Sequence, residues 1–137
     1  MATPPPSPPL PVPTEFSAPF WEAARQQKLV IQYCPESGKY QHYPRPVSIY
    51  TGKRNIEWRE VSGKGSAYAL TVTRRGPPAF RGQEPYLVAI VELDEGVRLL
   101  THIVNCSGED ARIGMRVRLR WRVLSDAFSF PVFEPDV

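Results

Sequence analysis

The chain has few of the residues that enzymes use for acid–base or nucleophilic chemistry. Among 137 residues there are two histidines, His42 and His102, and two cysteines, Cys34 and Cys106. No serine-hydrolase, zinc-protease or phosphate-loop motif is present. A catalytic thiol needs a base or a helix N-terminus beside it, and an offset of four residues on a strand places His102 and Cys106 about 13 Å apart. The sequence therefore predicts a protein that is not itself an enzyme.

Long apolar runs and disulfide-rich spacing are also missing. No apolar stretch approaches the roughly 20 residues that a membrane-spanning helix needs, and the first residues lack the pattern of a secretory signal. Two cysteines are too few for a disulfide scaffold. The net charge of +3 is too small to indicate a polyanionic partner by itself. We therefore expect a cytoplasmic protein with no membrane partner.

Residues 34–52 have the spacing of a four-cysteine zinc ribbon but only one of its cysteines. The four positions in two C-x-x-C-G-like turns are held by Cys34, Ser37, Ser48 and Thr51. Structural zinc needs four thiolate or imidazole ligands, and a hydroxyl group that stays protonated binds zinc poorly. The sequence predicts vestigial metal positions and no bound zinc. The alternative is that Cys34 is a lone thiol in an ordinary loop. Without metal, aromatic side chains are expected to fill the module; the candidates are Tyr33, Tyr40, Tyr43, Tyr50 and Trp58.

The second half of the chain has the alternation of a β-protein. Five strands are predicted, at about 57–73, 85–93, 97–105, 115–124 and 128–133. Gly63 and Gly65 mark a bend or bulge in the first strand, and residues 94–96 (Asp-Glu-Gly) form a tight turn. A five-stranded antiparallel set with a long, kinked first strand fits a small OB barrel.

The first part of the chain divides into a proline-rich tail and a short helix. Residues 1–13 hold seven of the sixteen prolines, which predicts an extended, disordered tail. Ser17 is expected to cap a helix that begins at Ala18. The aromatic residues Phe16, Phe20 and Trp21 need a partner, either the barrel or another protein. The predicted divisions are a tail at 1–13, a helix at 14–28, a zinc-free ribbon module at 29–56 and an OB domain at 57–137.

Several segments, taken in order, resemble one family of small proteins. The segments are Phe20-Trp21-Glu22 and residues 29–34, 44–46, 58–65, 85–96, 99–101 and 113–115. Over residues 16 to 135 the chain closely resembles the zinc-ribbon plus OB-fold proteins known as domain of unknown function thirty-five. The resemblance implies a mainly β fold with a rubredoxin-like ribbon before the barrel. It also implies a non-catalytic accessory subunit that binds a thiolase-like enzyme or acyltransferase and helps position acyl-CoA or acyl intermediates. Such a subunit binds no cofactor tightly and shares a coenzyme A ester with its partner.

The segment joining the first two predicted barrel strands is the candidate binding loop. It holds Arg74, Arg75 and Arg81 around Phe80, which is expected to be exposed. Arginine forks suit phosphate oxygens or acidic side chains, and an aromatic ring suits an adenine face. The residues are predicted to contact coenzyme A or an acidic partner. The alternative is a surface hairpin whose arginines only keep it soluble.

The fourth predicted strand alternates arginine with apolar residues, at Arg116, Arg118, Arg120 and Arg122. One face is then buried and the other carries guanidinium groups about 7 Å apart. A solvated outer face is the simplest interpretation, and a phosphate-binding or acidic-partner surface is the alternative. The second candidate function is therefore an OB module that binds single-stranded nucleic acid, with Tyr68, Phe80 or Tyr86 stacking on bases. The modest charge and the absence of aromatics between the arginines make nucleic acid the less favoured partner.

Overall fold

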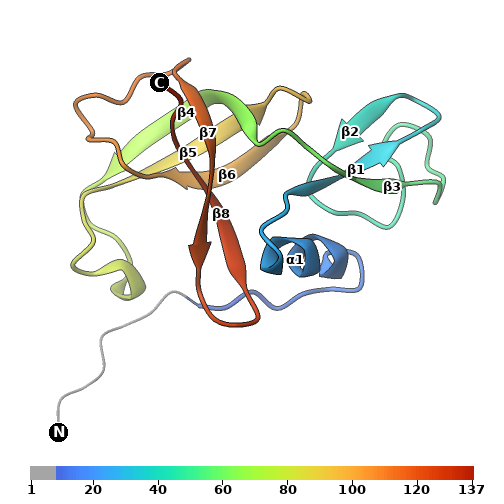
Figure 1. Ribbon diagram of the computed structural model, residues 1–137, viewed down its shortest axis with the longest axis horizontal. Coiled ribbons are helices and arrows are strands. Elements are labelled where there is room, and N and C mark those ends of the chain that lie inside the picture. Colours follow the sequence, from blue (N-terminus) through green and yellow to red (C-terminus); the bar gives the residue numbers. More distant parts are fainter. Residues whose placement is uncertain (1–8) are drawn as a thin grey trace, which may run out of the picture.

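The computed structural model describes residues 9–137 as one short helix followed by two β-sheets (Figure 1). Helix α1 spans Ala18–Arg25, and a three-stranded sheet has the order β2-β1-β3. A five-stranded sheet closes into a barrel with the order β4-β5-β6-β8-β7. The strands are β1 (Val30–Cys34), β2 (Lys39–Gln41), β3 (Glu57–Glu60), β4 (Lys64–Thr73), β5 (Tyr86–Leu93), β6 (Arg98–Ile103), β7 (Arg116–Val123) and β8 (Ser129–Pro135), with a 3-10 turn η1 at Pro78–Phe80. The predicted fold class is confirmed. Part of the predicted tail, residues 1–8, lies outside the described residues.

The long strand predicted at 57–73 is wrong, because the structure divides it between the two sheets. β3 pairs with β1, while β4 pairs with β5 and β7. Between them Gly63 has a φ of 74°, and a Cβ there would lie 2.8 Å from the Cβ of Leu119. The bulge lies between Ala67 and Ala69 rather than at either predicted glycine. A side chain at Gly65 would collide with the backbone carbonyl of Glu92, so this glycine allows close strand approach.

Alternating side chains of the barrel strands form the main core. In β5 the buried residues are Leu87, Ala89, Val91 and Leu93, the period of two expected for a strand with one buried face. Phe133 of β8 is fully buried. The barrel closes where β6 meets β8 in parallel pairing at one residue pair, and the Thr101 hydroxyl donates to the Pro131 carbonyl at 2.8 Å.

Helix α1 packs against both sheets. Phe20 and Ala24 are buried, and the Phe20 ring lies 5.7 Å from the His42 ring of the ribbon module. The Trp21 ring lies 6.1 Å from both Phe128 and Phe130. The helix aromatics Phe20 and Trp21, which were expected to need a partner, therefore pack within the chain itself. In Figure 1, α1 lies beside β8 and below the three-stranded sheet.

The predicted helix start has the right position but not the predicted cap. Ser17 occupies the N-cap position without capping the helix through its side chain. Its hydroxyl instead accepts a hydrogen bond from the Thr14 N–H at 2.8 Å. Phe16, one turn before Phe20, is 40% exposed and does not join the buried face. No helix in the described part of the chain is long and apolar enough to cross a membrane.

Candidate binding surfaces and the vestigial metal positions

Three of the four vestigial positions come together at the end of β1. Cys34 and Ser48 are buried. The neighbouring Ser37 and Ser48 hydroxyl groups favour the thiolate and lower the pKa of Cys34 to about 7, against the effect of burial, which raises it. The Ser48 hydroxyl also accepts from the N–H groups of Tyr50 and Thr51, at 3.1 and 3.3 Å. The serine therefore shapes the turn in which a ribbon would place a ligand.

The donor set at these positions does not suit structural zinc. It offers one thiol and hydroxyl groups where four thiolates or imidazoles are needed. Among residues 9–137, no three His, Cys, Asp or Glu side chains gather in a way that could hold a metal ion. The side-chain oxygen of Ser37 is buried and has no hydrogen-bond partner within the described residues. That single oxygen does not supply the missing ligands. The absence of zinc stays a prediction.

Two buried glutamine side chains hold the ribbon module together. Gln32 and Gln41 face each other across β1 and β2. The Gln41 amide donates to Gln32 at 2.7 Å and to the Val47 carbonyl at 3.1 Å, and its oxygen accepts from the Ile49 N–H at 2.8 Å. Gln32 donates to the Arg45 carbonyl at 2.8 Å and accepts from the Arg45 N–H at 2.9 Å. These bonds fasten the second turn of the ribbon to its strands.

Sequence reasoning missed this amide network and named aromatic residues instead. Tyr33 and Tyr40 do pack together, with ring centroids 4.9 Å apart, and Trp58 packs against the core. Tyr43 and Tyr50 are 53% and 43% exposed, so their prediction as fillers was wrong. The available signal was glutamine at inward-facing strand positions, where an apolar residue is usual.

The candidate loop places its arginines and its aromatic residue in different environments. Arg74, Arg75 and Arg81 are exposed, and they form no ion pair within the described chain. Phe80 is half-buried, 5.3 Å from the Tyr86 ring and 5.4 Å from the His102 ring. The expectation of an exposed Phe80 was wrong because η1 folds the ring onto the barrel. Contact of these residues with coenzyme A or an acidic partner stays a prediction.

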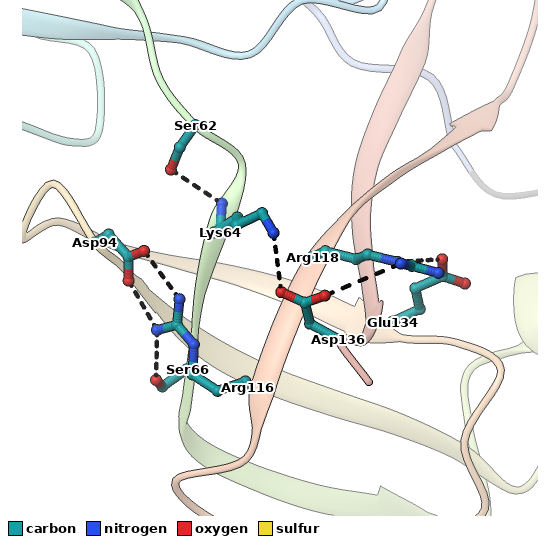
Figure 2. A network of polar contacts seen from close by, with 8 residues as sticks. All are labelled: Ser62, Lys64, Ser66, Asp94, Arg116, Arg118, Glu134 and Asp136. Atoms are coloured by element: carbon teal, nitrogen blue, oxygen red, sulfur yellow. Dashed lines mark hydrogen bonds and ion pairs between the residues drawn. The ribbon is translucent and has the colours of Figure 1, made fainter.

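The arginines of β7 lie on the outer face, and most of them are paired. Figure 2 shows Arg116 in a two-pronged contact with Asp94, at 2.8 and 2.9 Å. Arg118 lies 3.0 Å and Arg120 3.6 Å from Glu134. Because Asp94 and Glu134 already pair with three arginines of the strand and offset part of their charge, the structure gives little support to a face that tracks nucleic-acid phosphates.

Among residues 9–137, no hydrogen bond joins either histidine to a thiol. Burial lowers the pKa of His42 to about 4, which leaves a neutral ring packed between Phe20 and Tyr43. Burial and the Arg122 charge lower the pKa of His102. Burial raises the pKa of Cys106, and its thiol donates to the Ser107 carbonyl at 3.4 Å. These environments favour the neutral form of each group, and the absence of a catalytic pair stays a prediction.

An apolar groove of about 300 Å³ runs between α1, the second ribbon turn and the exposed edge of β6. The main residues of this α1–β6 groove are Phe20, Trp21, Tyr43, Pro44, Leu100 and Phe130. The Leu100 N–H donates to the Tyr43 hydroxyl at 3.0 Å, which ties the ribbon module to the barrel. Leu100 in the groove is 56% exposed, and Phe16, which directly precedes the groove residue Ser17, is 40% exposed. The groove is the place where the aromatic helix and the barrel present apolar surface together.

Two family models match consecutive parts of the chain. Residues 21–47 match the rubredoxin-like zinc ribbon domain of ChsH2, and residues 58–122 match its C-terminal OB-fold domain. A Pyrococcus furiosus protein called "DUF35 domain-containing scaffold protein" is 31% identical over 107 residues, which are 78% of this chain and 79% of the relative. The chain belongs to the DUF35 family. Its ribbon module and barrel correspond to these two ChsH2 domains.

Other relatives of this DUF35 chain extend the comparison. A Thermomonospora curvata protein, "Probable enoyl-CoA hydratase alpha subunit", is 40% identical over 120 residues, or 86% of this chain. A Methanocaldococcus jannaschii scaffold protein is 41% identical over 76 residues, or 54% of this chain. The chain spans only 37% and 54% of the lengths of these two relatives.

Solved structures match most of this DUF35 chain. A chain of the "Ltp2-ChsH2(DUF35) aldolase" is 37% identical with a TM-score of 0.85, covering 93% of this chain and 100% of that one. A DUF35 protein of unknown function from Sulfolobus solfataricus has a TM-score of 0.63 at 15% identity, over 89% of this chain and 86% of that one. This second likeness shows the fold alone.

Proposed function

We propose that this DUF35 chain is a non-catalytic accessory subunit of a thiolase-like enzyme or acyltransferase. The observation that carries the proposal is its likeness to the DUF35 chain of the Ltp2-ChsH2 aldolase, which it matches over that chain's whole length. Relatives called scaffold proteins support the accessory role. The relative called an enoyl-CoA hydratase subunit supports work on acyl-CoA. We further infer a cytoplasmic location, with the two free thiols Cys34 and Cys106 in a reducing compartment.

The α1–β6 groove is our candidate docking surface for that enzyme. It joins both sheets of the molecule, so a partner that covers it also fixes the ribbon module relative to the barrel. Apolar surface left exposed beside a polar rim is typical of protein interfaces. We expect an apolar segment of the partner to cover Phe16 and Leu100, and the exposed loop arginines Arg74, Arg75 and Arg81 to contact acyl-CoA phosphates or acidic residues at the rim.

Binding to a thiolase-like partner tests the proposal directly. The chain is co-expressed with such an enzyme from the same organism, and the complex is isolated through a tag on the enzyme. Phe16→Glu and Leu100→Glu should each weaken the complex by about tenfold or more, because a charge would be buried in an apolar contact. Phe20→Glu is a poor choice, since Phe20 is buried and its loss would disturb the fold.

The matched control is Ile113→Glu, which changes another exposed apolar residue outside the groove. This variant should bind the enzyme as the unchanged chain does. The isolated chain should neither cleave nor transfer acyl groups from coenzyme A esters, and it should raise the activity or stability of the enzyme. Equal binding by all three variants would reject the groove as the docking surface. Steady acyl-CoA turnover by the pure chain would reject the accessory role.

A further inference from the structure

Arg122 differs from the other three arginines of β7. Arg116, Arg118 and Arg120 each lie within 4.0 Å of a carboxylate, and Figure 2 shows two of these contacts. Arg122 is half-buried, and within residues 9–137 no carboxylate is paired with it. Its side-chain contact is with Nδ1 of His102, at 3.4 Å. A partly buried cation without an opposite charge is costly, and a bound anion would relieve that cost.

The contact with Arg122 determines which ring nitrogen of His102 can donate a hydrogen bond to such an anion. A guanidinium group has only donors, so Nδ1 of His102 must accept and the proton of the neutral ring must lie on Nε2. Burial and the neighbouring Arg122 charge lower the pKa of His102, which keeps the ring neutral at pH 7. The pair therefore offers one positive charge and several N–H donors, with no carboxylate in competition.

Arg122 and His102 stand between two hollows of the barrel end. One hollow has a volume of about 360 Å³ and includes Tyr86, Asn105 and Ser107 in its wall. The other is smaller, about 180 Å³, and includes Phe80, Leu124 and Phe130. Both share Arg122 and His102. The loop after β4 and the loop after β7 border this end, the place where OB barrels bind ligands.

Aromatic rings surround the paired side chains. The His102 ring lies 5.0 Å from the Tyr86 ring and 5.4 Å from the Phe80 ring, and Phe80 lies 5.3 Å from Tyr86. These rings offer flat apolar surface next to a cation. A ligand with only a charged group would leave that surface unused, and a purely apolar ligand would leave the cation unpaired.

We propose that Arg122 and His102 form an anion site for a small molecule with one phosphate or carboxylate group on a flat, unsaturated body. The guanidinium fork of Arg122 binds two oxygens of the anion, and Nε2–H of His102 donates to one of them. The flat body lies against Tyr86 and Phe80. This inference goes beyond the accessory role, because the chain itself binds the small molecule without a partner enzyme.

Three probes in NMR titrations of the full ¹⁵N-labelled chain test the site. Phenyl phosphate and benzoate carry the two candidate anions on a flat ring, and inorganic phosphate carries the charge alone. We expect phenyl phosphate or benzoate to shift the resonances of Arg122, His102 and the loop at residues 105–108. Tighter binding of phenyl phosphate would identify phosphate as the preferred anion, and tighter binding of benzoate would identify carboxylate. The bound anion offsets the Arg122 charge, so it should also raise the pKa of His102 measured by NMR.

Variants separate this site from general surface charge. Arg122→Gln should weaken binding of the preferred ring-bearing probe by about tenfold or more, whereas Arg54→Gln, an exposed position with the same loss of charge, should change it less than about twofold. Arg122→Lys should restore part of the affinity. Tyr86→Leu should weaken the ring-bearing probe more than inorganic phosphate. Each variant is compared only if its spectrum keeps the dispersion of a folded chain.

Three results would overturn the site. The first is an equal loss in Arg54→Gln and Arg122→Gln, which would indicate diffuse surface charge. The second is resonance shifts confined to residues away from both hollows. The third is no binding of any probe up to its solubility limit. Complex formation with the thiolase-like enzyme is measured on the same Arg122→Gln protein and should be unchanged, so failure of this site and failure of the accessory role are distinguishable.

Discussion

The ribbon module and the barrel reach a fixed structure by different means. The barrel buries alternating apolar side chains around Phe133 and carries paired charges on its outer face. The ribbon has a small sheet and places the amides of Gln32 and Gln41 in its centre. Apolar contacts tolerate small changes in shape, whereas a buried hydrogen-bond network is stabilising only while every member is satisfied. The two regions should therefore fail in different ways.

The largest effect is expected in the barrel core. Phe133 is fully buried, so Phe133→Ala should lower the free energy of unfolding by about 3–5 kcal/mol through lost burial and a residual cavity. Chemical denaturation followed by circular dichroism measures this change. Phe16→Ala, at an exposed aromatic position, is the control and should cost much less. Similar losses in both variants would mean that the barrel is not the dominant core.

A smaller and more local effect is expected in the ribbon. Gln41→Ala removes the partners of the Ile49 N–H and the Val47 carbonyl, and one of the two donors to the Gln32 oxygen. Leaving buried polar groups unpaired should cost about 2–4 kcal/mol. Hydrogen exchange should accelerate at Ile49 while amides of β5 keep their protection.

Gln83→Ala, at an exposed glutamine, is the control and should leave hydrogen exchange in both sheets unchanged. Uniform acceleration in β1 and β5 with Gln41→Ala would show that the two regions unfold as one unit. It would then reject the local role given to the glutamine network.

The charged face of the barrel should make the free energy of unfolding depend on pH in the acid range. Hydrogen bonds from Asn105 and Arg118, together with the Arg120 charge, hold the pKa of Glu134 below its ordinary value of 4.5. A lowered folded-state pKa adds stability that is present above the unfolded value and is lost as the pH falls through the folded value. Glu134→Gln should therefore lose less stability than the unchanged chain between pH 6 and pH 3. Glu109→Gln, at an exposed site, should lose stability with falling pH as the unchanged chain does. If the free energy of unfolding fell equally in all three proteins, Glu134 would not be a source of the acid sensitivity.

Features that depend on neighbouring residues could be predicted from the sequence. The alternation of arginine and apolar residues in β7 predicts its two faces, and Asp94 to Gly96 predict the turn between β5 and β6. The division of 57–73 could not be predicted, because the need for a glycine at position 63 arises from Leu119, which is distant in sequence. The residue types show a bend, and only the packing shows that the chain changes sheets there.

The candidate sites were predictable to a smaller extent. The exposed loop arginines follow from composition and turn chemistry. The placement of Phe80 does not, since it depends on Tyr86 and His102. Gln32 and Gln41 pair across a hairpin, and Arg122 of β7 meets His102 of β6 although β8 lies between these strands in the barrel order. Each of these contacts joins polar residues that have ordinary surface roles when the sequence is read alone.

The smallest effect is expected from metal removal. The response to a chelator should distinguish this ribbon most clearly from a ribbon that zinc holds together. Since the Cys34, Ser37, Ser48 and Thr51 positions offer one thiol, a chelator should leave the melting temperature unchanged within about 1 °C, and metal analysis should find well under one zinc per chain. A triple variant, Ser37→Cys, Ser48→Cys and Thr51→Cys, is the positive control. It should bind one zinc and then lose stability in the ribbon, but not in the barrel, when the metal is removed. A full equivalent of zinc in the unchanged chain, with loss of ribbon structure on chelation, would show that metal and not the glutamine network holds this module.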